Sequence, residues 1–257
     1  MKVRCLLICV AVLFIVGLLT TSSYAKIDPQ TCVGMWLFDE GSGNVAKDSS
    51  ENKNDGTLMN DPKWVDGKFG KALEFDGVDD YVEIPDSNGL DITNNITIVC
   101  WVLKRPSSRG TVVGKWKQVG DVWSYVLYDV GEGGGGFRLR WGDGSQTNLE
   151  GPYQLPTDEW VHYAATYDGS IMKVFVNGKE IVNIAAKNKI NVETNPVWIG
   201  NDGYQQHFKG MIDDVAILNA ALSEGDVIDI MTKGLSTVSN VSSSGKLTTT
   251  WANIKAQ

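Results

Sequence analysis

The stretch WVHYAATYDGSIMKVFVNGKEIV, residues 160–182, alternates its side chains around two turn signals. From Val161 to Tyr167 every second residue is suited to one buried face, and in a β-strand such residues share a side of the sheet. The Asp-Gly pair at 168–169 and the Asn-Gly pair at 177–178 supply the positive φ angles that tight hairpin turns require. The stretch therefore predicts a three-stranded antiparallel meander.

Strand-like segments recur along the rest of the chain, separated by clusters of Gly, Asn and Asp. They are residues 33–39, 72–76, 80–85, 96–104, 123–130, 137–141, 196–200 and 213–218. In residues 96–104 both alternating sets of side chains are mostly apolar, which is typical of a central strand covered on both faces. One helix is predicted in LSEGDVIDIMTKG, where Ser223 caps the start and Lys233-Gly234 closes the end. The pattern predicts an all-β, two-sheet antiparallel sandwich with one short C-terminal helix.

Tryptophan is frequent in these segments. Trp36, Trp101, Trp160 and Trp198 all lie within strand patterns. Large aromatic side chains dominate the energetics of protein cores. We therefore predict that these four residues fill the space between the two sheets.

Residues 1–25 have the organisation of a secretory signal peptide. Lys2 and Arg4 precede an unbroken apolar run over residues 5–19, and small residues lead to a cleavage site after Ala25. The run is shorter than the roughly 20 apolar residues of a membrane span. We therefore expect an exported protein, secreted or at the cell surface, with no stable membrane span after cleavage.

The remaining chain is predicted to form one domain over residues 26–234. A Ser/Thr-rich linker and a short tail follow over residues 235–257. Without residues 1–25 the chain has 21 basic and 31 acidic residues, a formal charge of −10. This charge argues against nucleic acid and anionic membranes as partners.

Cys32 and Cys100 are the two cysteines outside the predicted signal peptide. In an oxidising compartment such a pair is able to form a disulfide. Each cysteine also lies in an apolar strand-like run, where a buried free thiol is an ordinary core residue. The sequence leaves both interpretations open.

Seven motifs occur in an order that resembles a known family. They are WLFDEGSG (36–43), W-x-x-G-x-x-G-x-A-L-x-F-D-G (64–77), DDYVEIP (79–85), ITIVCWV (96–102), WVHYAATYDG (160–169), VFVNGK (174–179) and F-x-G-x-I-D-D-V-A-I-L…ALSEGDV (208–227). Together they resemble the laminin-G-like jellyroll domains of the concanavalin A-like lectin/glucanase superfamily, with similarity to pentraxins in the strand at 160 and the last block. The resemblance covers about residues 33–231 and implies a jellyroll sandwich.

Acidic residues cluster at two predicted strand ends. Asp76, Asp79 and Asp80 crowd one turn, and Asp213 opens a late strand. Calcium requires such hard oxygen ligands, but aspartate also populates turns in order to bond its own backbone. The resemblance implies a structural calcium ion, because FDGVDDYV and GMIDDV match acidic positions of relatives that bind calcium at a sandwich edge. We predict Asp76, Asp80 and Asp213 as ligands, with Glu40 as an additional candidate and an affinity of roughly 10⁻⁴–10⁻³ M.

Candidate carbohydrate-binding residues lie in the middle third of the chain. Flat aromatic rings stack on sugars, and polar groups bond the hydroxyls. The candidates are Trp116, Trp123, Tyr125, Arg138, Arg140 and Trp141. Trp123 and Tyr125 are predicted to share a strand face, and the lysines beside Trp116 predict its exposure. For each individual aromatic residue a place in the core or a loop is the more common outcome, and this interpretation stays open.

Catalytic signals are weak in this sequence. Retaining glycoside hydrolases need two carboxyl groups about 5–5.5 Å apart, which an E-x-D-x-E strand would provide, and no such pattern occurs. His162 is interpreted as a structural strand residue. We predict a non-catalytic binding module for an extracellular glycan or glycoprotein. The alternatives are a structural or adhesive protein-interaction domain and an unrecognised glycoside hydrolase.

Overall fold

The computed structural model describes residues 27–117, 122–129, 131, 135–151, 153–202 and 207–238. The predicted signal peptide and the chain beyond residue 238 lie outside the described residues. Within the described part, no helix has the length and apolar character needed to cross a membrane.

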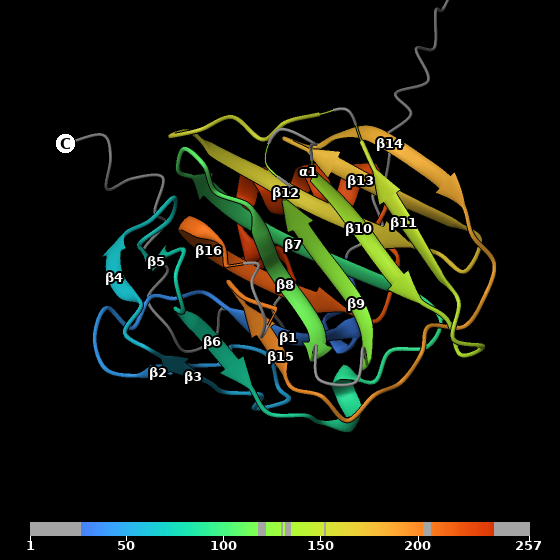
Figure 1. Cartoon of the computed structure of the whole chain (residues 1–257), viewed down its shortest axis with the longest axis horizontal. Coiled ribbons are helices and arrows are strands. Elements are labelled where there is room, and N and C mark those ends of the chain that lie inside the picture. The colour runs from blue at the N-terminus through green and yellow to red at the C-terminus, as the bar shows by residue number, and fades with distance from the viewer. Residues whose placement is uncertain are drawn as a thin grey trace, which may run out of the picture.

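Two antiparallel sheets of eight strands each form the domain (Figure 1). Sheet A runs in the order β14 (Lys179–Ala185), β13 (Ile171–Val176), β12 (Trp160–Tyr167), β7 (Ile96–Lys104), β16 (Lys209–Leu218), β5 (Lys71–Asp76) and β4 (Lys63–Asp66), and β1 (Cys32–Trp36) also pairs with β16. Sheet B runs in the order β11 (Gln146–Glu150), β10 (Gly135–Arg140), β9 (Val122–Asp129), β8 (Gly110–Lys117), β15 (Val197–Ile199), β6 (Tyr81–Ile84), β3 (Gly56–Met59) and β2 (Val45–Ala46). The predicted two-sheet jellyroll sandwich is confirmed.

The main core lies between the two sheets. Val161, Tyr163, Ala165 and Tyr167 point into it from β12, as their alternation predicts. All nine residues of β7 are buried, which confirms that this strand is central and covered on both faces. The meander of β12, β13 and β14 is also confirmed, with the predicted turns between the strands.

The helix α1 (Glu224–Lys233) covers part of the outer face of sheet A. Val227 and Ile230 of the helix belong to a second buried cluster that includes Ala164 of β12. Ser223 forms the predicted cap, and a capping box with Asp226 completes it. Short 3-10 turns occur at Pro29–Thr31, Asn88–Leu90 and Leu235–Thr237. Leu235 and Val238, just beyond the predicted domain boundary at residue 234, are buried in the same cluster.

The prediction for the four tryptophans is right for one of them. Trp36 is fully buried in the main core. Trp101, Trp160 and Trp198 point away from the core, because each has a neighbour in the same strand that occupies the core position instead. Val161 takes that position beside Trp160, for example. The alternation of strand side chains then places each of these three rings on an outer face.

The disulfide interpretation is wrong, and the buried-thiol interpretation is confirmed. Cys32 and Cys100 are both free and buried. Cys100 points into the main core, whereas Cys32 belongs to the cluster under α1 on the other face of sheet A. A bridge requires the two β-carbons to face one another, and here the sheet separates them. Burial raises the pKa of both thiols, so neither is an activated nucleophile.

Candidate functional site

A continuous row of paired residues crosses the outer face of sheet B. It consists of Thr57, Glu83, Trp198, Gly114, Val126, Arg138 and Asn148, from β3 to β11. Their strand neighbours, such as Val82, Val113 and Leu127, point into the core, so the row itself faces outward. We call these seven residues the outer row.

An aromatic cluster lies over the middle of the outer row. Trp123, Val126 and Tyr128 are buried there, and the partly exposed Trp116 packs against them. The ring centroids of Trp116 and Trp123 are 6.1 Å apart. The guanidinium group of Arg140 lies 5.8 Å from the Trp123 ring centroid. The cluster thus combines apolar rings with cationic groups on a sheet face outside the core.

Arg138 is held in place by two neighbours on this face, Tyr128 and Glu150. Its guanidinium group stacks on the Tyr128 ring at 4.0 Å and donates to Glu150 Oε1 at 3.2 Å. Tyr128 Oη donates to the same oxygen at 2.6 Å. The hydrogen bond from Tyr128 and the charge of Arg138 lower the pKa of Glu150, while burial raises the pKa of Tyr128. Arg138 is therefore pre-positioned beside the aromatic cluster.

Several polar atoms of this face are buried without a hydrogen-bond partner. Trp116 Nε1, Arg138 Nε and Thr111 Oγ1 belong to this set among the residues that the structure describes. The first two are obligate donors, so only an acceptor atom can satisfy them. Buried polar groups are rarely left unpaired, so these donors need an acceptor that the described residues do not supply, from water or from a ligand.

Four of the six sequence-predicted ligand residues meet on this face, namely Trp116, Trp123, Arg138 and Arg140. Tyr125 and Trp141 do not. Tyr125 is fully buried in the main core, and Trp141 packs there against Tyr167 with ring centroids 5.4 Å apart. Neither ring has a face available to a ligand, so the prediction is wrong for these two residues.

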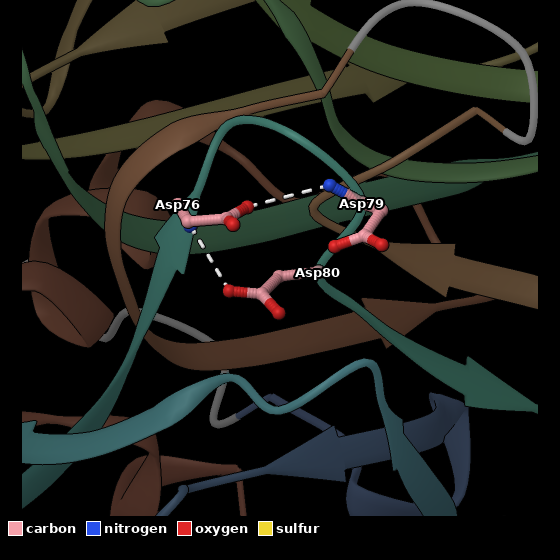
Figure 2. A group of neighbouring side chains, drawn as sticks. All are labelled: Asp76, Asp79 and Asp80. Atoms are coloured by element: carbon pink, nitrogen blue, oxygen red, sulfur yellow. Dashed lines mark hydrogen bonds between the residues drawn. The ribbon is translucent and has the colours of Figure 1, made fainter.

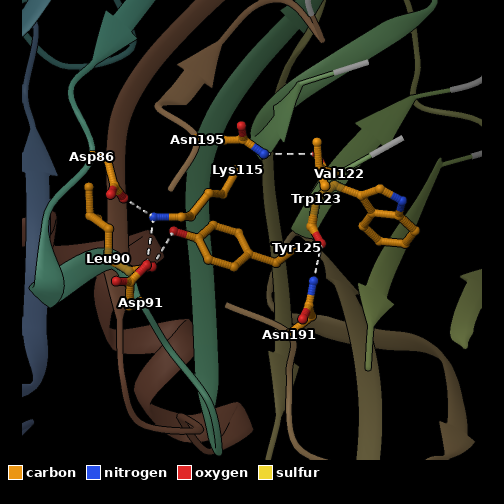
Figure 3. A network of polar contacts seen from close by, with 9 residues as sticks. All are labelled: Asp86, Leu90, Asp91, Lys115, Val122, Trp123, Tyr125, Asn191 and Asn195. Atoms are coloured by element: carbon orange, nitrogen blue, oxygen red, sulfur yellow. Dashed lines mark hydrogen bonds and ion pairs between the residues drawn. The ribbon is translucent and has the colours of Figure 1, made fainter. Parts of the chain in front are cut away.

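The side chains of Trp123 and Tyr125 leave β9 in opposite directions (Figure 3). The prediction that they share a face is wrong because the pairing of β8 with β9 shifts its register between Gly114 and Trp116. Between the two pairs that these residues form, β9 has two residues, whereas β8 has only Lys115, and the extra residue in β9 forms a β-bulge. The extra residue reverses the alternation, so that Trp123 joins Val126 on the outer face.

The exposure of Trp116 does not come from its lysine neighbours. Lys115 is fully buried and forms ion pairs with Asp86 and, at 2.8 Å, with Asp91 (Figure 3). Tyr125 Oη donates to the carbonyl oxygen of Leu90 at 3.2 Å beside this network. Lys115 thus ties β8 to the segment after β6, and this network holds one side of the outer face in place.

Sequence reasoning missed a second aromatic position on the outer face. The rings of Tyr81 and Trp198 are 5.2 Å apart, and both are partly exposed. Trp198 Nε1 donates to Glu83 Oε2 at 3.0 Å. A signal for this position exists in the segment Val197-Trp198-Ile199, because two aliphatic neighbours that face the core require the ring between them to face outward.

Asp76, at the end of β5, converges with Asp79 and Asp80 of the loop that leads to β6 (Figure 2). Each offers a carboxylate oxygen, and these oxygens lie within 4.8 Å of one another. Asp76 Oδ1 accepts from the backbone of Val78 at 2.7 Å, and Asp80 Oδ2 accepts from the backbone of Asp76 at 3.1 Å. We call these three aspartates the loop group.

The loop group suits a cation. Burial and the charges of Asp76, Asp79 and Asp61 raise the pKa of Asp80 to about 6. Three convergent carboxylates of this kind match the oxygen ligands that calcium takes, and a divalent ion would offset their repulsion. Asp76 and Asp80 also line an open groove of about 670 Å³, together with the cationic side chains of Lys63, Arg105 and Lys209.

Asp213 does not join the loop group. Lys209, not Asp213, pairs with Asp76, and Asp213 lies four residues further along β16. At about 3.3 Å per residue this separates them by about 13 Å. The predicted ligand set of Asp76, Asp80 and Asp213 is therefore wrong as a single site.

Asp213 instead belongs to a second acidic group with Asp39 and Asp214, which we call the strand group. Asp213 is fully buried, its Oδ2 accepts from the backbone of Phe69 at 3.0 Å, and its Oδ1 has no partner among the described residues. Burial, with the charge of Asp39, raises the pKa of Asp213 to about 7 and that of Asp214 to about 8. Glu40 follows Asp39 and accepts from the backbone of Lys47 at 3.0 Å.

Comparisons with known proteins agree with this architecture. One similar structure is domain 4 of AbnA, a GH43 extracellular arabinanase from Geobacillus stearothermophilus, solved in complex with arabinotriose. It superposes on this chain with a TM-score of 0.63 at 23% sequence identity, and the superposition covers 78% of this chain and 98% of the AbnA domain. The binding domain of Paraclostridial mosquitocidal protein 1 gives 0.63 at 14% identity, covering 79% and 52%. The binding domain of botulinum neurotoxin serotype G gives 0.63 at 13%, covering 78% and 50%. At these identities the likeness shows the fold.

In sequence, the chain is 28% identical over 85 residues to pappalysin-1 of Mus musculus, across 31% of this chain and 5% of that protein. The chain thus spans a small part of this curated relative and about half of each toxin domain. The Laminin_G_3 sequence model, described as the concanavalin A-like lectin/glucanases superfamily, matches residues 76–228. This match covers more than half of the chain, which therefore belongs to the Laminin_G_3 family of the concanavalin A-like lectin/glucanases superfamily.

Proposed function

We propose that this protein is an exported binding module that recognises an extracellular glycan or glycoprotein through the outer face of sheet B. The main support is the cluster at Trp116, where flat rings lie beside two donors, Trp116 Nε1 and Arg138 Nε, that have no described partner. Sugar rings present apolar faces to aromatic residues and oxygen acceptors to such donors. The arabinotriose complex of the similar AbnA domain is consistent with this role.

Binding without hydrolysis is favoured by the placement of the carboxylates on this face. Glu83 lies on β6 and Glu150 on β11, five strand spacings apart. At about 4.8 Å per spacing this distance is about 24 Å. Glycosidase carboxyl pairs stand about 5–9.5 Å apart, so these two residues do not form such a pair.

A glycan array on the mature domain tests the proposed function. Wild type is expected to bind one class of glycan, and Trp116→Ala or Arg138→Gln is expected to weaken binding at least about tenfold, since central aromatic and Arg residues carry most interface energy. Trp160→Ala is the matched control, because Trp160 is a partly exposed tryptophan of the other sheet. A folded wild type that binds no glycan, or equal binding by all variants, would instead favour the adhesive protein-interaction role.

The proposed module also holds a structural calcium ion. The loop group fits best, because its three carboxylates converge, and a bound ion there would fix the loop that leads directly into Tyr81 and the outer face. The ion would supply charge neutralisation for Asp76, Asp79 and Asp80. The strand group is the second candidate, because Asp213 Oδ1 is buried without a described partner.

Calcium is expected to raise the melting temperature of the chelated protein. For an affinity of roughly 10⁻⁴–10⁻³ M, 10 mM calcium stabilises by about 1.4–2.7 kcal/mol, or about 3–11 °C for a domain of this size. Asp80→Asn should abolish the shift if the loop group binds the ion, and Asp213→Asn if the strand group does. The exposed Asp143→Asn is the control. An unchanged melting temperature in wild type would contradict the calcium proposal.

A further inference from the structure

The outer row extends well beyond the aromatic cluster. From Trp198 on β15 the row passes through Gly114 and Val126 to Arg138 on β10. These are three strand spacings, about 14 Å, which is longer than one sugar ring. Partly exposed rings or charged groups therefore occur at both ends of a straight path, with Trp116 packed over its middle.

Trp198 is held rigidly at its end of this path. The bond from Nε1 to Glu83 fixes the indole ring, and the Tyr81 ring supports it at 5.2 Å with an interplanar angle of 53°. Glu83 is the next member of the outer row, so its carboxylate stands beside the ring as an acceptor. A ring that is pre-positioned in this way loses little conformational entropy when a ligand stacks on it.

We infer that the ligand is a linear oligosaccharide lying along the outer row, and that Trp198 and Glu83 form a second subsite at the end opposite Arg138. This inference rests on the proposed glycan recognition and specifies its ligand as an extended chain that fills several subsites. Trp198 stacks on one sugar unit, Glu83 accepts from its hydroxyls, and the Trp116 and Arg138 positions hold units further along the chain.

The chemistry of the row favours a glycan over an extended peptide. Peptides that add to a sheet do so at an unpaired strand edge. Every strand between β6 and β10 is paired on both sides, so the backbone of this face is already bonded. Flat rings at Trp198 and Trp116, flanked along the row by the charged groups of Glu83 and Arg138, match the apolar faces and hydroxyls of a sugar chain.

Affinity measured against chain length tests the inference. The probes are arabino-, xylo- and cello-oligosaccharides from monosaccharide to hexasaccharide, titrated calorimetrically into the mature domain. Wild-type affinity is expected to rise with length in the series that binds. Trp198→Ala is expected to weaken hexasaccharide binding about tenfold and leave disaccharide binding at the Trp116 end unchanged. Trp198→Phe, which keeps a ring, should retain most of the affinity, and Trp160→Ala should match wild type.

The outcomes separate this inference from the proposed function. A folded protein that binds none of these probes and no glycan on the array contradicts both. Binding whose affinity does not depend on chain length, or equal hexasaccharide affinity in wild type and Trp198→Ala, overturns the second subsite alone. If Trp198→Ala does not fold, as judged by thermal unfolding, the length dependence of wild type and the affinity of Trp198→Phe still decide the matter.

Discussion

Replacing Lys104 by methionine is expected to lower the free energy of unfolding by about 3–5 kcal/mol. Lys104 on β7 and Asp129 on β9 form an ion pair between the two sheets, with Nζ 2.8 Å from Oδ2 and side chains that are 6% and 0% exposed. Removal of the lysine leaves a buried carboxylate without its cation, and desolvation already raises the pKa of Asp129 in the wild type. Urea unfolding monitored by tryptophan fluorescence would measure the loss.

Two controls make this prediction specific. The double variant Lys104→Met/Asp129→Leu should regain much of the lost stability, because an apolar pair of similar volume carries no desolvation cost. Lys63→Met removes an exposed ion pair with Asp61, whose side chains are 63% and 79% exposed, and should cost at most about 1 kcal/mol. A Lys104→Met protein as stable as Lys63→Met would contradict the assigned role of the buried pair.

The chelated protein is expected to lose about 2–3 kcal/mol of stability between pH 6.5 and 8. Asp213 and Asp214 have pKa values raised to about 7 and about 8, mainly by burial. A carboxyl group with a raised pKa binds its proton more tightly in the folded state. It therefore stabilises the fold at pH values below its unfolded pKa of about 4, and this contribution is lost as the pH rises through the folded value.

Below pH 6.5 His162 acts in the opposite direction. Burial lowers its pKa to about 4, so the unfolded state takes up the proton first and stability falls as the pH is lowered from about 6.5. The window from pH 6.5 to 8 therefore isolates the aspartates. Urea unfolding in chelator at four pH values measures the slope, and Asp213→Asn/Asp214→Asn should flatten it. A flat profile in the wild type would show that these carboxyl groups are not perturbed.

Calcium makes the same measurement informative about the strand group. A cation bound to Asp213 would lower the pKa values of both carboxyl groups and remove the decline above pH 6.5. A decline that persists in calcium would place the ion, if one binds, at the loop group. The pH profile thus complements the Asp80→Asn and Asp213→Asn melting experiments.

Much of the fold could be predicted from local sequence patterns. The meander from β12 to β14 could be predicted because its two turns and the alternation of its apolar side chains lie within 23 adjacent residues. β8 and β11 were not predicted, since GTVVGKWK contains two glycines and QTNLE is mostly polar. Such strands form because paired neighbours supply their hydrogen bonds and contacts, and intrinsic β propensity is weaker than that context.

The candidate site was predicted only in part, and the errors have two sources. One is the bulge in β9, which places Trp123 on the outer face and leaves Tyr125 in the core. A single extra residue in one strand moves every later side chain of that strand to the opposite face, and no local sequence pattern indicates where such a bulge occurs. The other is an assumption that large rings fill the core, which misplaced Trp198 although its aliphatic neighbours indicated the outer face.

The sequence alone determined the all-β class, the capped helix and most strand positions, because alternation, turn residues and caps act over a few adjacent residues. Only the tertiary structure decided which distant residues meet. It grouped Asp76 with Asp80 and separated both from Asp213, because the register of β16 against β5 sets these distances. It also aligned Trp198 with Arg138, since that alignment depends on three strand pairings at once. Register is a property of paired strands, and a single chain segment does not contain it.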